Sequence, residues 1–363
     1  MSGAAITVYV KLKEIVSDSA AVTACVIGVG FLSGSEATYY WGSFRNVAVF
    51  CVCFFALHFL FRETRRKQGA AYMRVLNNAL VAFACEGCKL TCAVSLLACF
   101  NQCIARAIAP SDLPLYSAAA ALICGVLYTK TPHVFKILNV LSLLLAALFL
   151  LLVLPQGGGS QSDAPLWRPA VYALFTASAT FTLTDKLHCK SKKDNAAGAL
   201  LTCAVLGALM CLLTFCCDFR LSVPAIDFTR QPAGAVGCAA VTVSTICSLK
   251  ELSAQAFETA EDITGDRALS ASAVLCLEMA TSLLGFDVLL KYGYLFAGAV
   301  GFALCLACLV CTTKNRPEGR LCLFHTAGAL CELYLLEEVI SFIIHKDKRR
   351  EIFHFNFPDG FHS

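Results

Sequence analysis

Runs of apolar residues about as long as a bilayer is thick recur along the whole of this chain. A transmembrane helix needs roughly 20 consecutive apolar residues, and eleven stretches of this kind alternate with short polar segments. Hydrophobic residues make up 58% of the 363 residues and charged residues only 15%, whereas soluble globular proteins contain about 25% charged residues. We therefore predict an all-α polytopic membrane protein with about 11 transmembrane helices.

The predicted spans occupy most of the chain and leave only short loops between them. They cover residues 19–35, 46–61, 75–99, 113–129, 135–154, 169–184, 196–217, 233–257, 268–290, 292–311 and 321–344. The strands of a membrane β-barrel would instead be about 10 residues long with alternating polarity, and no stretch of the chain alternates in this way. No signal peptide precedes the first span, which we expect to act as an uncleaved start-transfer helix.

Lysine and arginine are shared unequally between the two sets of loops that eleven spans create. One set contains fifteen of these residues, at positions 62–74, 130–136, 186–193, 267 and 314–320, and the other contains six. Because cytoplasmic loops retain positive charge, we predict that the richer set and the N-terminus are cytoplasmic. The C-terminal tail then falls outside in spite of its basic residues, which a miscounted span or a topology fixed by earlier segments would explain.

The 22 cysteines of the chain lie mostly inside the predicted spans. In apolar helices cysteine packs much as alanine or serine does, so we interpret these residues as packing residues. Cys85 and Cys88 have a spacing that metal sites use, but they lie within a span without a second pair or a histidine nearby. A structural zinc ion needs four ligands, and we therefore predict no metal site.

Motifs of catalysis and nucleotide binding are not found in the sequence. Gly28 and Gly30 have the spacing of part of a dinucleotide-binding loop, but no strand precedes them, and Gly30 with Gly34 favours close helix packing instead. The sequence contains no nucleophile elbow, zinc-protease or Walker motif. The net charge of +4, without a basic stripe interleaved with aromatic residues, does not indicate nucleic-acid binding. We predict neither an enzyme nor a cofactor.

Ionisable residues inside the predicted spans are the candidates for a functional site, because a charge in the bilayer core is costly unless it is paired or hydrated. Glu86 and Lys89, three residues apart, can meet on one face of a helix. Lys250 and Glu251 point about 100° apart, so each is expected to need a partner on another helix. Glu278 lies in the ninth span. Such groups either line a water-filled cavity or form salt bridges between helices.

The segment Phe257–Ala271, with the sequence FETAEDITGDRALSA, resembles the eighth-helix signature of equilibrative nucleoside transporters. The signature is an Asp-x-x-Gly-Arg followed by small apolar residues, and Asp262, Gly265 and Arg267 match it here. Asp266 is an extra residue, and the Asn that commonly precedes the Asp is absent. The resemblance implies that Asp262 and Arg267 contact the substrate or gate its passage. The extra residue is expected to rotate Arg267 by about 100° on a helix.

The chain also resembles the multispan envelope proteins of herpesviruses, which look like a reduced form of the same transporter architecture. The basic loop Lys314–Arg320 and the segment Cys331–Leu336 carry this resemblance, and Leu187 and His188 ahead of the seventh span fit it. The two resemblances imply a nucleoside-transporter-like arrangement of six plus five helices. We expect a six-helix half at residues 1–185, a short basic cytoplasmic loop at 186–194, a five-helix half at 195–345 and a short basic tail at 346–363.

Three classes of function follow from these observations. The leading hypothesis is a viral, herpesvirus-type envelope or infected-cell membrane protein, in which transport is lost or altered. The alternative is an active carrier for nucleosides or another small polar solute, with a site between its two halves. Its candidate substrate-binding or gating residues are Asp262, Arg267, Glu86, Lys89, Lys250 and Glu278. The third class is a structural or adhesive protein that acts through its outer loops.

The implied partners are the lipid bilayer, viral or host membrane proteins and a small polar solute, with no nucleic acid among them. A polar cavity that reaches the middle of the membrane would favour the carrier. A core closed by salt bridges would favour the structural protein.

Overall fold

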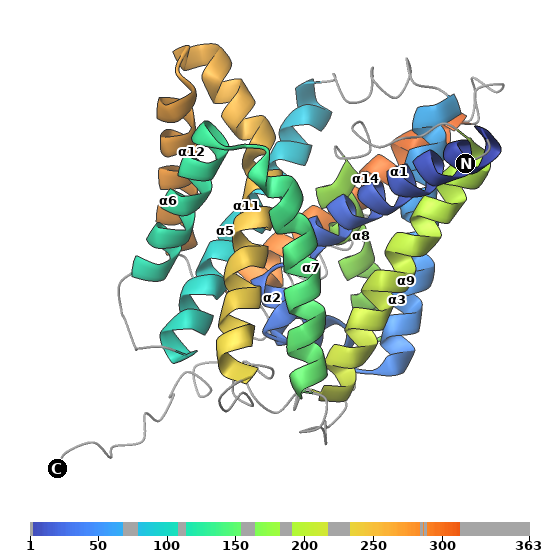
Figure 1. Ribbon diagram of the computed structural model, residues 1–363, viewed down its shortest axis with the longest axis horizontal. Helices are drawn as coiled ribbons and strands as arrows, with labels where there is room; N and C mark the ends of the chain where they lie inside the picture. Colours follow the sequence, from blue (N-terminus) through green and yellow to red (C-terminus); the bar gives the residue numbers. More distant parts are fainter. Residues whose placement is uncertain are drawn as a thin grey trace, which may run out of the picture. The chain divides into compact units, whose positions relative to one another are not determined.

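The apolar stretches of the chain fold into helices that pack against one another (Figure 1). The computed structural model describes residues 3–67, 79–107, 114–153, 164–181, 191–216, 233–283, 286 and 289–312. Every regular element within these ranges is helical, and none is a strand. The prediction of an all-α polytopic membrane protein is confirmed at this level.

Helices of the described residues overlap each of the first ten predicted spans, but the first predicted span is interrupted and the helix in the ninth ends early, at Ser282. In chain order the elements are α1 (Gly3–Val26), α2 (Val29–Leu32), the π-helical turn η1 (Ala37–Trp41), α3 (Phe44–Lys67), α5 (Ala79–Ala107), α6 (Leu115–Lys130), α7 (Val134–Val153), α8 (Trp167–Phe181), α9 (Lys192–Cys216), α11 (Ala233–Thr264), α12 (Arg267–Ser282), the π-helical turn η4 (Leu289–Gly293) and α14 (Tyr294–Thr312). Helices from before and after the predicted loop at 186–194 pack against each other, as α3 does on α9, α7 on α11 and α8 on α14.

Six helical segments of the described residues are long and apolar enough to cross a bilayer. They are Phe44–Lys67, Glu86–Ala105, Val134–Val153, Lys192–Cys216, Gly234–Thr264 and Leu289–Cys308. α6 is also apolar but has only 16 residues. These helices support a multi-pass integral membrane protein, while the count of eleven spans stays a prediction. The eleventh predicted span, residues 321–344, and the tail lie outside the described residues.

Exposed apolar side chains mark the outer helices of the bundle. Large hydrophobic residues that are more than half exposed occur on α3, α6, α7, α9 and α12, and they include Val52, Leu122, Ile137, Leu144, Leu200 and Leu277. Soluble monomers rarely expose apolar patches on this scale, whereas lipid tails cover them at no cost. α8 is mostly buried and packs on α3 and α14. The outer helices therefore face lipid, and α8 belongs to the interior.

The first predicted span is broken in two. A single continuous helix was expected over residues 19–35, but α1 ends at Val26 and α2 begins only at Val29. A Cβ atom on Gly28 would lie 2.7 Å from Cδ1 of Leu96 on α5, so the backbone at the break packs closely on α5. Gly34, with a φ of 80°, lies outside both helices. The predicted packing of one helix through Gly30 and Gly34 is therefore wrong.

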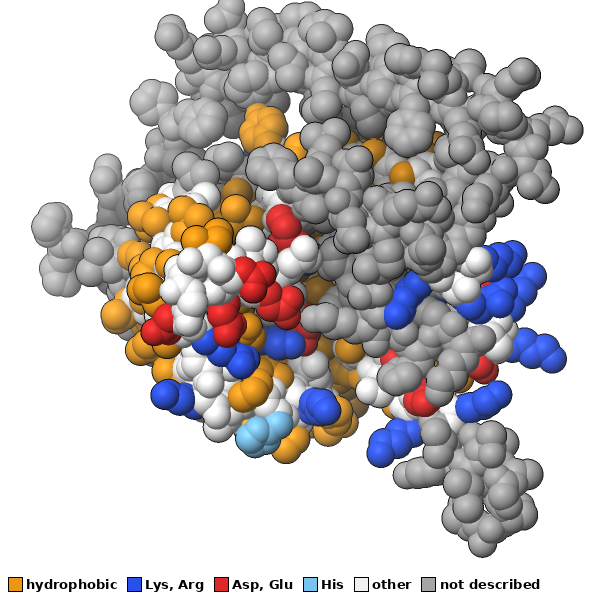
Figure 2. Space-filling model, turned by 90° about the horizontal axis from the view of Figure 1, so that it is seen from above, with side chains coloured by type: hydrophobic (Ala, Val, Ile, Leu, Met, Phe, Trp, Pro, Cys, Tyr) orange, Lys and Arg blue, Asp and Glu red, His pale blue; other side chains and the backbone are white. Residues whose placement is uncertain are grey.

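Exposed basic side chains gather at one end of the helices, which is the upper end in Figure 1. This end contains the last turn of α3, the connection from α6 to α7, the start of α9 and the turn from α11 to α12. Its exposed basic residues include Lys67, Lys130, Lys136, Lys192 and Arg267. Figure 2 looks onto this end and shows acidic side chains beside the basic ones. All five basic residues belong to the loops or helix ends that the charge pattern predicts to be cytoplasmic.

Candidate functional site

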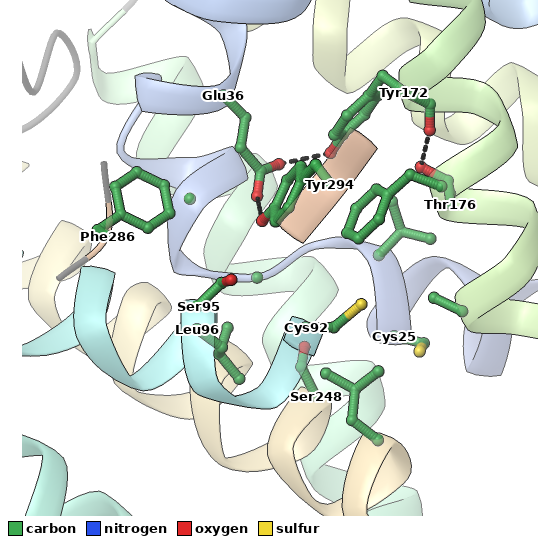
Figure 3. Close-up of a pocket in the computed structure, with 16 residues that line it drawn as sticks. Cys25, Glu36, Cys92, Ser95, Leu96, Tyr172, Thr176, Ser248, Phe286 and Tyr294 are labelled. Atoms are coloured by element: carbon green, nitrogen blue, oxygen red, sulfur yellow. Dashed lines mark hydrogen bonds between the residues drawn. The ribbon is translucent and has the colours of Figure 1, made fainter. Parts of the chain in front are cut away.

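A small buried cavity lies where the backbone between α1 and α2 breaks (Figure 3). Its volume is about 40 Å³, which is enough for ordered water or a small ion. Its walls come from α1, α2, α5, α8, α11 and α14, together with Glu36 and Phe286. Non-helical backbone inside a membrane protein is tolerated only where it is buried in protein or lines such a cavity. The break therefore marks the candidate functional site.

Among the described residues that line the cavity, Glu36 is the one Asp, Glu, Lys or Arg. Its side chain is 5% exposed. The hydroxyl of Tyr172 on α8 donates to Oε2 of Glu36 at 2.5 Å, and the hydroxyl of Tyr294 on α14 donates to Oε1 at 2.6 Å. Figure 3 shows the hydroxyls of both tyrosines directed at the carboxylate. A Cβ atom on Gly30 would collide with the Glu36 carboxylate, so glycine there makes room for the acid.

Aromatic rings enclose this carboxylate. The rings of Phe175 and Tyr294 stack at 3.9 Å between centroids, and Tyr40 stacks on Tyr294 at 5.7 Å. Trp41 is fully buried and lies 5.0 Å from the ring of Tyr172. The hydroxyl of Tyr40 donates to the carbonyl oxygen of Leu290 at 2.8 Å. Because rings fix position at a low cost in side-chain entropy, the cluster holds the tyrosyl hydroxyls toward Glu36.

The remaining polar groups of the cavity are hydroxyls whose protons are already used. The hydroxyl of Ser95 donates to the carbonyl of Thr91 at 2.7 Å, and that of Ser248 donates to the carbonyl of Ala24 at 2.9 Å. The hydroxyl of Thr176 donates to the carbonyl of Tyr172 at 2.7 Å. A hydroxyl has one proton and two lone pairs, so these three oxygens remain as acceptors.

Glu86 and Lys89 meet as the sequence spacing predicts. Lys89 Nζ lies 2.8 Å from Oε1 of Glu86, and it also donates to Oε1 of Gln255 on α11 at 2.9 Å. Lys89 is 4% exposed. The pair therefore ties α5 to α11, and neither residue lines the cavity at the helix break.

The prediction that Lys250 and Glu251 each need a partner on another helix is wrong. Lys250 Nζ contacts Oε1 of Glu251 itself at 2.7 Å. The two Cα–Cβ bonds do diverge on the helix, but the long lysine side chain bends back across the helix surface to its neighbour. Lys250 also lies 5.7 Å from the ring centroid of Phe135 on α7.

Glu278 on α12 is buried without a basic partner in the described part of the chain. Its side chain is 1% exposed, and Oε1 accepts a hydrogen bond from the hydroxyl of Ser253 on α11 at 2.7 Å. Its other oxygen, Oε2, has no hydrogen-bond partner among the described residues. Glu278 lies outside the lining of the cavity.

Asp262 and Arg267, the residues of the transporter-like segment, lie at the turn between α11 and α12 and are exposed. Nη2 of Arg267 donates to the carbonyl of Tyr128 at 3.1 Å, and its guanidinium lies 4.3 Å from the ring centroid of that tyrosine. Neither residue lines the cavity. The extra residue Asp266 does not rotate Arg267 along one continuous helix, because Asp266 is the N-cap of a new helix.

The Asp266 carboxylate accepts hydrogen bonds from the backbone N–H groups of Ala268 and Leu269 at 2.7 and 3.0 Å. Gly265 precedes it with a φ of 69°, a conformation that glycine adopts without strain. The donated hydrogen bonds, that of Leu269 first, hold the pKa of Asp266 below its ordinary value of 3.8. The transporter-like segment thus forms a capped turn at the end that carries the basic residues.

A second polar cluster joins α1, α3 and α9. Nη2 of Arg62 lies 3.1 Å from Oδ2 of Asp18, and both side chains are buried. The side-chain amide of Asn195 on α9 donates to Oε2 of Glu63 at 3.2 Å. A Cβ atom on Gly198 would lie 2.9 Å from Nη2 of Arg62. This cluster therefore links α1, α3 and α9.

Glu36, Tyr172 and Tyr294 are not among the site residues predicted from the sequence. Glu36 falls at the edge of the first predicted span, and the tyrosines that bind it lie 136 and 258 residues away. The available signal was an acid inside the stretch Gly28–Trp41, which is rich in glycine, serine and aromatic residues. Such a stretch favours an irregular backbone over a regular helix.

Within the described residues no group of three or more His, Cys, Asp or Glu side chains is placed to hold a metal ion. The described cysteines are free thiols. No protein-family model matches the chain, and no curated protein sequence matches it either.

Proposed function

We propose that this chain is a transporter-like membrane protein that carries a small polar solute through a centre at its broken first helix. The observation that supports the carrier is the break between α1 and α2 around a buried, acid-lined cavity. Broken helices that supply backbone and side-chain ligands at the centre of the bundle are the recurring binding element of secondary transporters. The Glu36 carboxylate and the hydroxyls of Ser95, Thr176 and Ser248 are the polar groups of this centre.

The proposal includes the nucleoside-transporter-like layout of eleven spans in six plus five. The described helices are compatible with it, since a helix covers each of the first ten predicted spans at least in part. The helices that contribute to the cavity come from both proposed halves, with α1, α5 and α8 from the first and α11 and α14 from the second. A site at the interface of two halves is what alternating access requires.

The cavity is too small for a nucleoside in this conformation. Its volume of about 40 Å³ compares with about 300–1,000 Å³ for sites that hold drug-sized ligands. A carrier closed in this way admits its solute only after helices move apart. The buried ion pair between Asp18 and Arg62 joins α1 to α3, so this pair has to separate or move as a unit when α1 swings.

The test is uptake of labelled nucleosides and other small polar solutes into transporter-deficient cells that express the chain. We expect saturable uptake that is abolished by Glu36→Gln, with surface expression unchanged. The matched control is Glu278→Gln, which neutralises a carboxylate that is equally buried but lies outside the cavity. It is expected to retain uptake.

A neutralised Asp262→Asn/Arg267→Gln variant tests the site that the family resemblance implies. Loss of uptake in this variant would assign the two exposed residues a gating role. Absence of uptake in the unmodified chain, despite correct insertion at the cell surface, would overturn the carrier proposal.

The second candidate is a herpesvirus-type envelope or infected-cell membrane protein that keeps the scaffold without transport. Two observations favour it. The cavity is small, and neighbouring helices are fastened by the buried ion pair Arg62–Asp18 and by the hydrogen bond from Lys89 to Gln255. We expect a tagged chain expressed in herpesvirus-infected cells to copurify with virion envelopes. Recovery of the tagged chain only in internal cell membranes, and not in virion envelopes, would count against an envelope role.

A further inference from the structure

Glu36 is a buried acid without a basic partner in the described helices. The buried basic side chains of those helices are engaged elsewhere, since Lys89 binds Glu86 at 2.8 Å and Arg62 binds Asp18 at 3.1 Å. Two neutral tyrosyl hydroxyls bind Glu36 instead. Hydrogen bonds from neutral groups reduce the cost of burying a carboxylate, but they leave its charge uncompensated.

The described residues that line the cavity beside Glu36 present acceptors and no basic side chain. The hydroxyls of Ser95, Thr176 and Ser248 each donate their proton to a backbone carbonyl. Their lone pairs are therefore the groups left to meet an occupant. A cation that prefers oxygen ligands finds several in such an arrangement.

The C-terminal end of α1 also favours a cation in the cavity. Cys25 and Val26, in the last turn of α1, line the cavity. The C-terminal end of a helix carries a partial negative charge, and α1 has 24 residues, long enough for that effect to develop. The carboxylate, the hydroxyl oxygens and the helix end thus all favour positive charge at one place.

The size of the cavity restricts the cation. A volume of about 40 Å³ accommodates an ion or a water molecule but not an organic solute of the size of a nucleoside. We infer that the cavity between α1, α5, α8 and α11 binds an alkali-metal cation, with the Glu36 carboxylate as its anionic ligand. This inference rests on the proposed carrier function and gives it a small cation as a second ligand.

The test is equilibrium binding of radiolabelled sodium to the purified full-length protein in lipid nanodiscs at pH 7.5, with choline chloride keeping the ionic strength constant. We expect saturable binding that unlabelled lithium or potassium displaces, and a saturable rise of the thermal unfolding midpoint with sodium. Glu36→Gln is expected to weaken binding at least about tenfold, since it removes the charged partner of a buried ion. Glu278→Gln serves as the matched control and is expected to bind as the unmodified protein does.

A milder variant keeps the cation site testable if Glu36→Gln does not fold. Thr176→Val keeps the shape of the side chain and removes the hydroxyl, with its acceptor oxygen and its hydrogen bond to the carbonyl of Tyr172. We expect the half-saturating sodium concentration to rise severalfold without loss of folded protein. A pH series in choline alone tests the proton as the rival occupant. Absence of sodium binding, or stabilisation by acidification alone that Glu36→Gln reproduces, would overturn the inference.

The binding assay and the uptake assay test the cation site and the carrier function independently. Solute uptake without alkali-cation binding overturns this inference and leaves the carrier proposal standing. Cation binding without solute uptake supports the cation site and overturns the carrier proposal.

Discussion

The guanidinium of Arg62 is completely buried and touches the carboxylate of Asp18 across the contact between α3 and α1. Two of its nitrogens, Nε and Nη1, have no hydrogen-bond partner among the described residues. A buried ion pair adds little net stability, because desolvation offsets attraction, yet removal of one partner leaves an uncompensated charge. Asp18 and Arg62 therefore act as a unit.

We predict that Asp18→Asn lowers the free energy of unfolding by about 3 kcal/mol or more. The double variant Asp18→Asn/Arg62→Met is expected to lose less than Asp18→Asn alone, because no charge is then left unpaired. Chemical unfolding in detergent micelles measures both. Lys67→Ala is the control, since its contact with Glu63 at 3.4 Å is half exposed and is expected to change stability by less than about 1 kcal/mol. The single variant Arg62→Met completes the comparison. A double variant whose loss of unfolding free energy equals the sum of the losses in Asp18→Asn and Arg62→Met would contradict the prediction.

Spacing along one helix predicted some side-chain contacts and misjudged others. Glu86 and Lys89 were predicted correctly because three residues bring both side chains to the same face. Lys250 and Glu251 were misjudged because the direction of Cβ does not limit a side chain with four rotatable bonds. Glu36 could not be identified as a site, since its role depends on tyrosines that only the tertiary fold brings to it.

At the level of helices, α14 packs closely against α8. A Cβ atom on Gly301 would overlap the carbonyl oxygen of Leu174, which is backbone and cannot rotate away. Gly298, one turn earlier, packs against Val171 of the same helix. Small residues that let two backbones approach are a principal source of helix association in membranes. The contact between α14 and α8 therefore depends on glycine at position 301.

We predict that Gly301→Ala forces α14 away from α8 and lowers stability by about 1–3 kcal/mol. The thermal unfolding midpoint of the purified protein measures the effect. Gly87→Ala is the matched control in α5, because its Cβ would lie 3.9 Å from the nearest atom, Cε1 of Phe296. This control is expected to be neutral or slightly stabilising, since alanine favours helix over glycine. Equal midpoints for the two variants would rule out the close contact.

The cap of α12 gives a prediction with a defined pH range. The pKa of Asp266 lies below its ordinary value of 3.8, so the cap stabilises α12 above that ordinary pKa and is lost as the pH falls through the lower, folded-state value. We expect the amides of Ala268 and Leu269 to lose protection from hydrogen exchange in acid, after correction for intrinsic rates.

Two variants of Asp266 complete this experiment. Asp266→Asn keeps a capping oxygen that does not titrate, so protection is expected to be independent of pH. Asp266→Ala is expected to lose protection at every pH. Full protection in the alanine variant would show that the cap does not stabilise the helix.

Helices were predictable from apolar runs, whereas their interruption was not. Hydropathy is high on both sides of Gly28, so a continuous span was the natural expectation for residues 19–35. The break arises from tertiary contacts, in which Leu96 of α5 occupies the place of a side chain at Gly28 and Glu36 that of one at Gly30. Contacts of this kind leave no periodic signal in the sequence.

On the scale of the described bundle, the exposed residues Lys67, Lys130, Lys136, Lys192 and Arg267 lie at one end, and exposed apolar residues occur on the outer helices. We predict that the basic end is cytoplasmic. An epitope inserted at Pro132, between α6 and α7, is expected to bind antibody only after cells are permeabilised. The matched epitope in the sequence Gly157–Gly159 is expected to bind antibody on intact cells. The reverse pattern would show that the positive-inside reasoning fails for this chain.

Trp41 is an intrinsic fluorescent reporter at the centre of the protein. The chain has two tryptophans, of which Trp41 is fully buried against Tyr172 and Trp167 is 37% exposed. In a Trp167→Phe background all tryptophan emission arises beside Tyr172, whose hydroxyl binds the Glu36 carboxylate. Movement of α1 and α2 that admits water to this place shifts the emission to longer wavelength. The opening and closing of the broken helix can therefore be followed in time without attaching a dye.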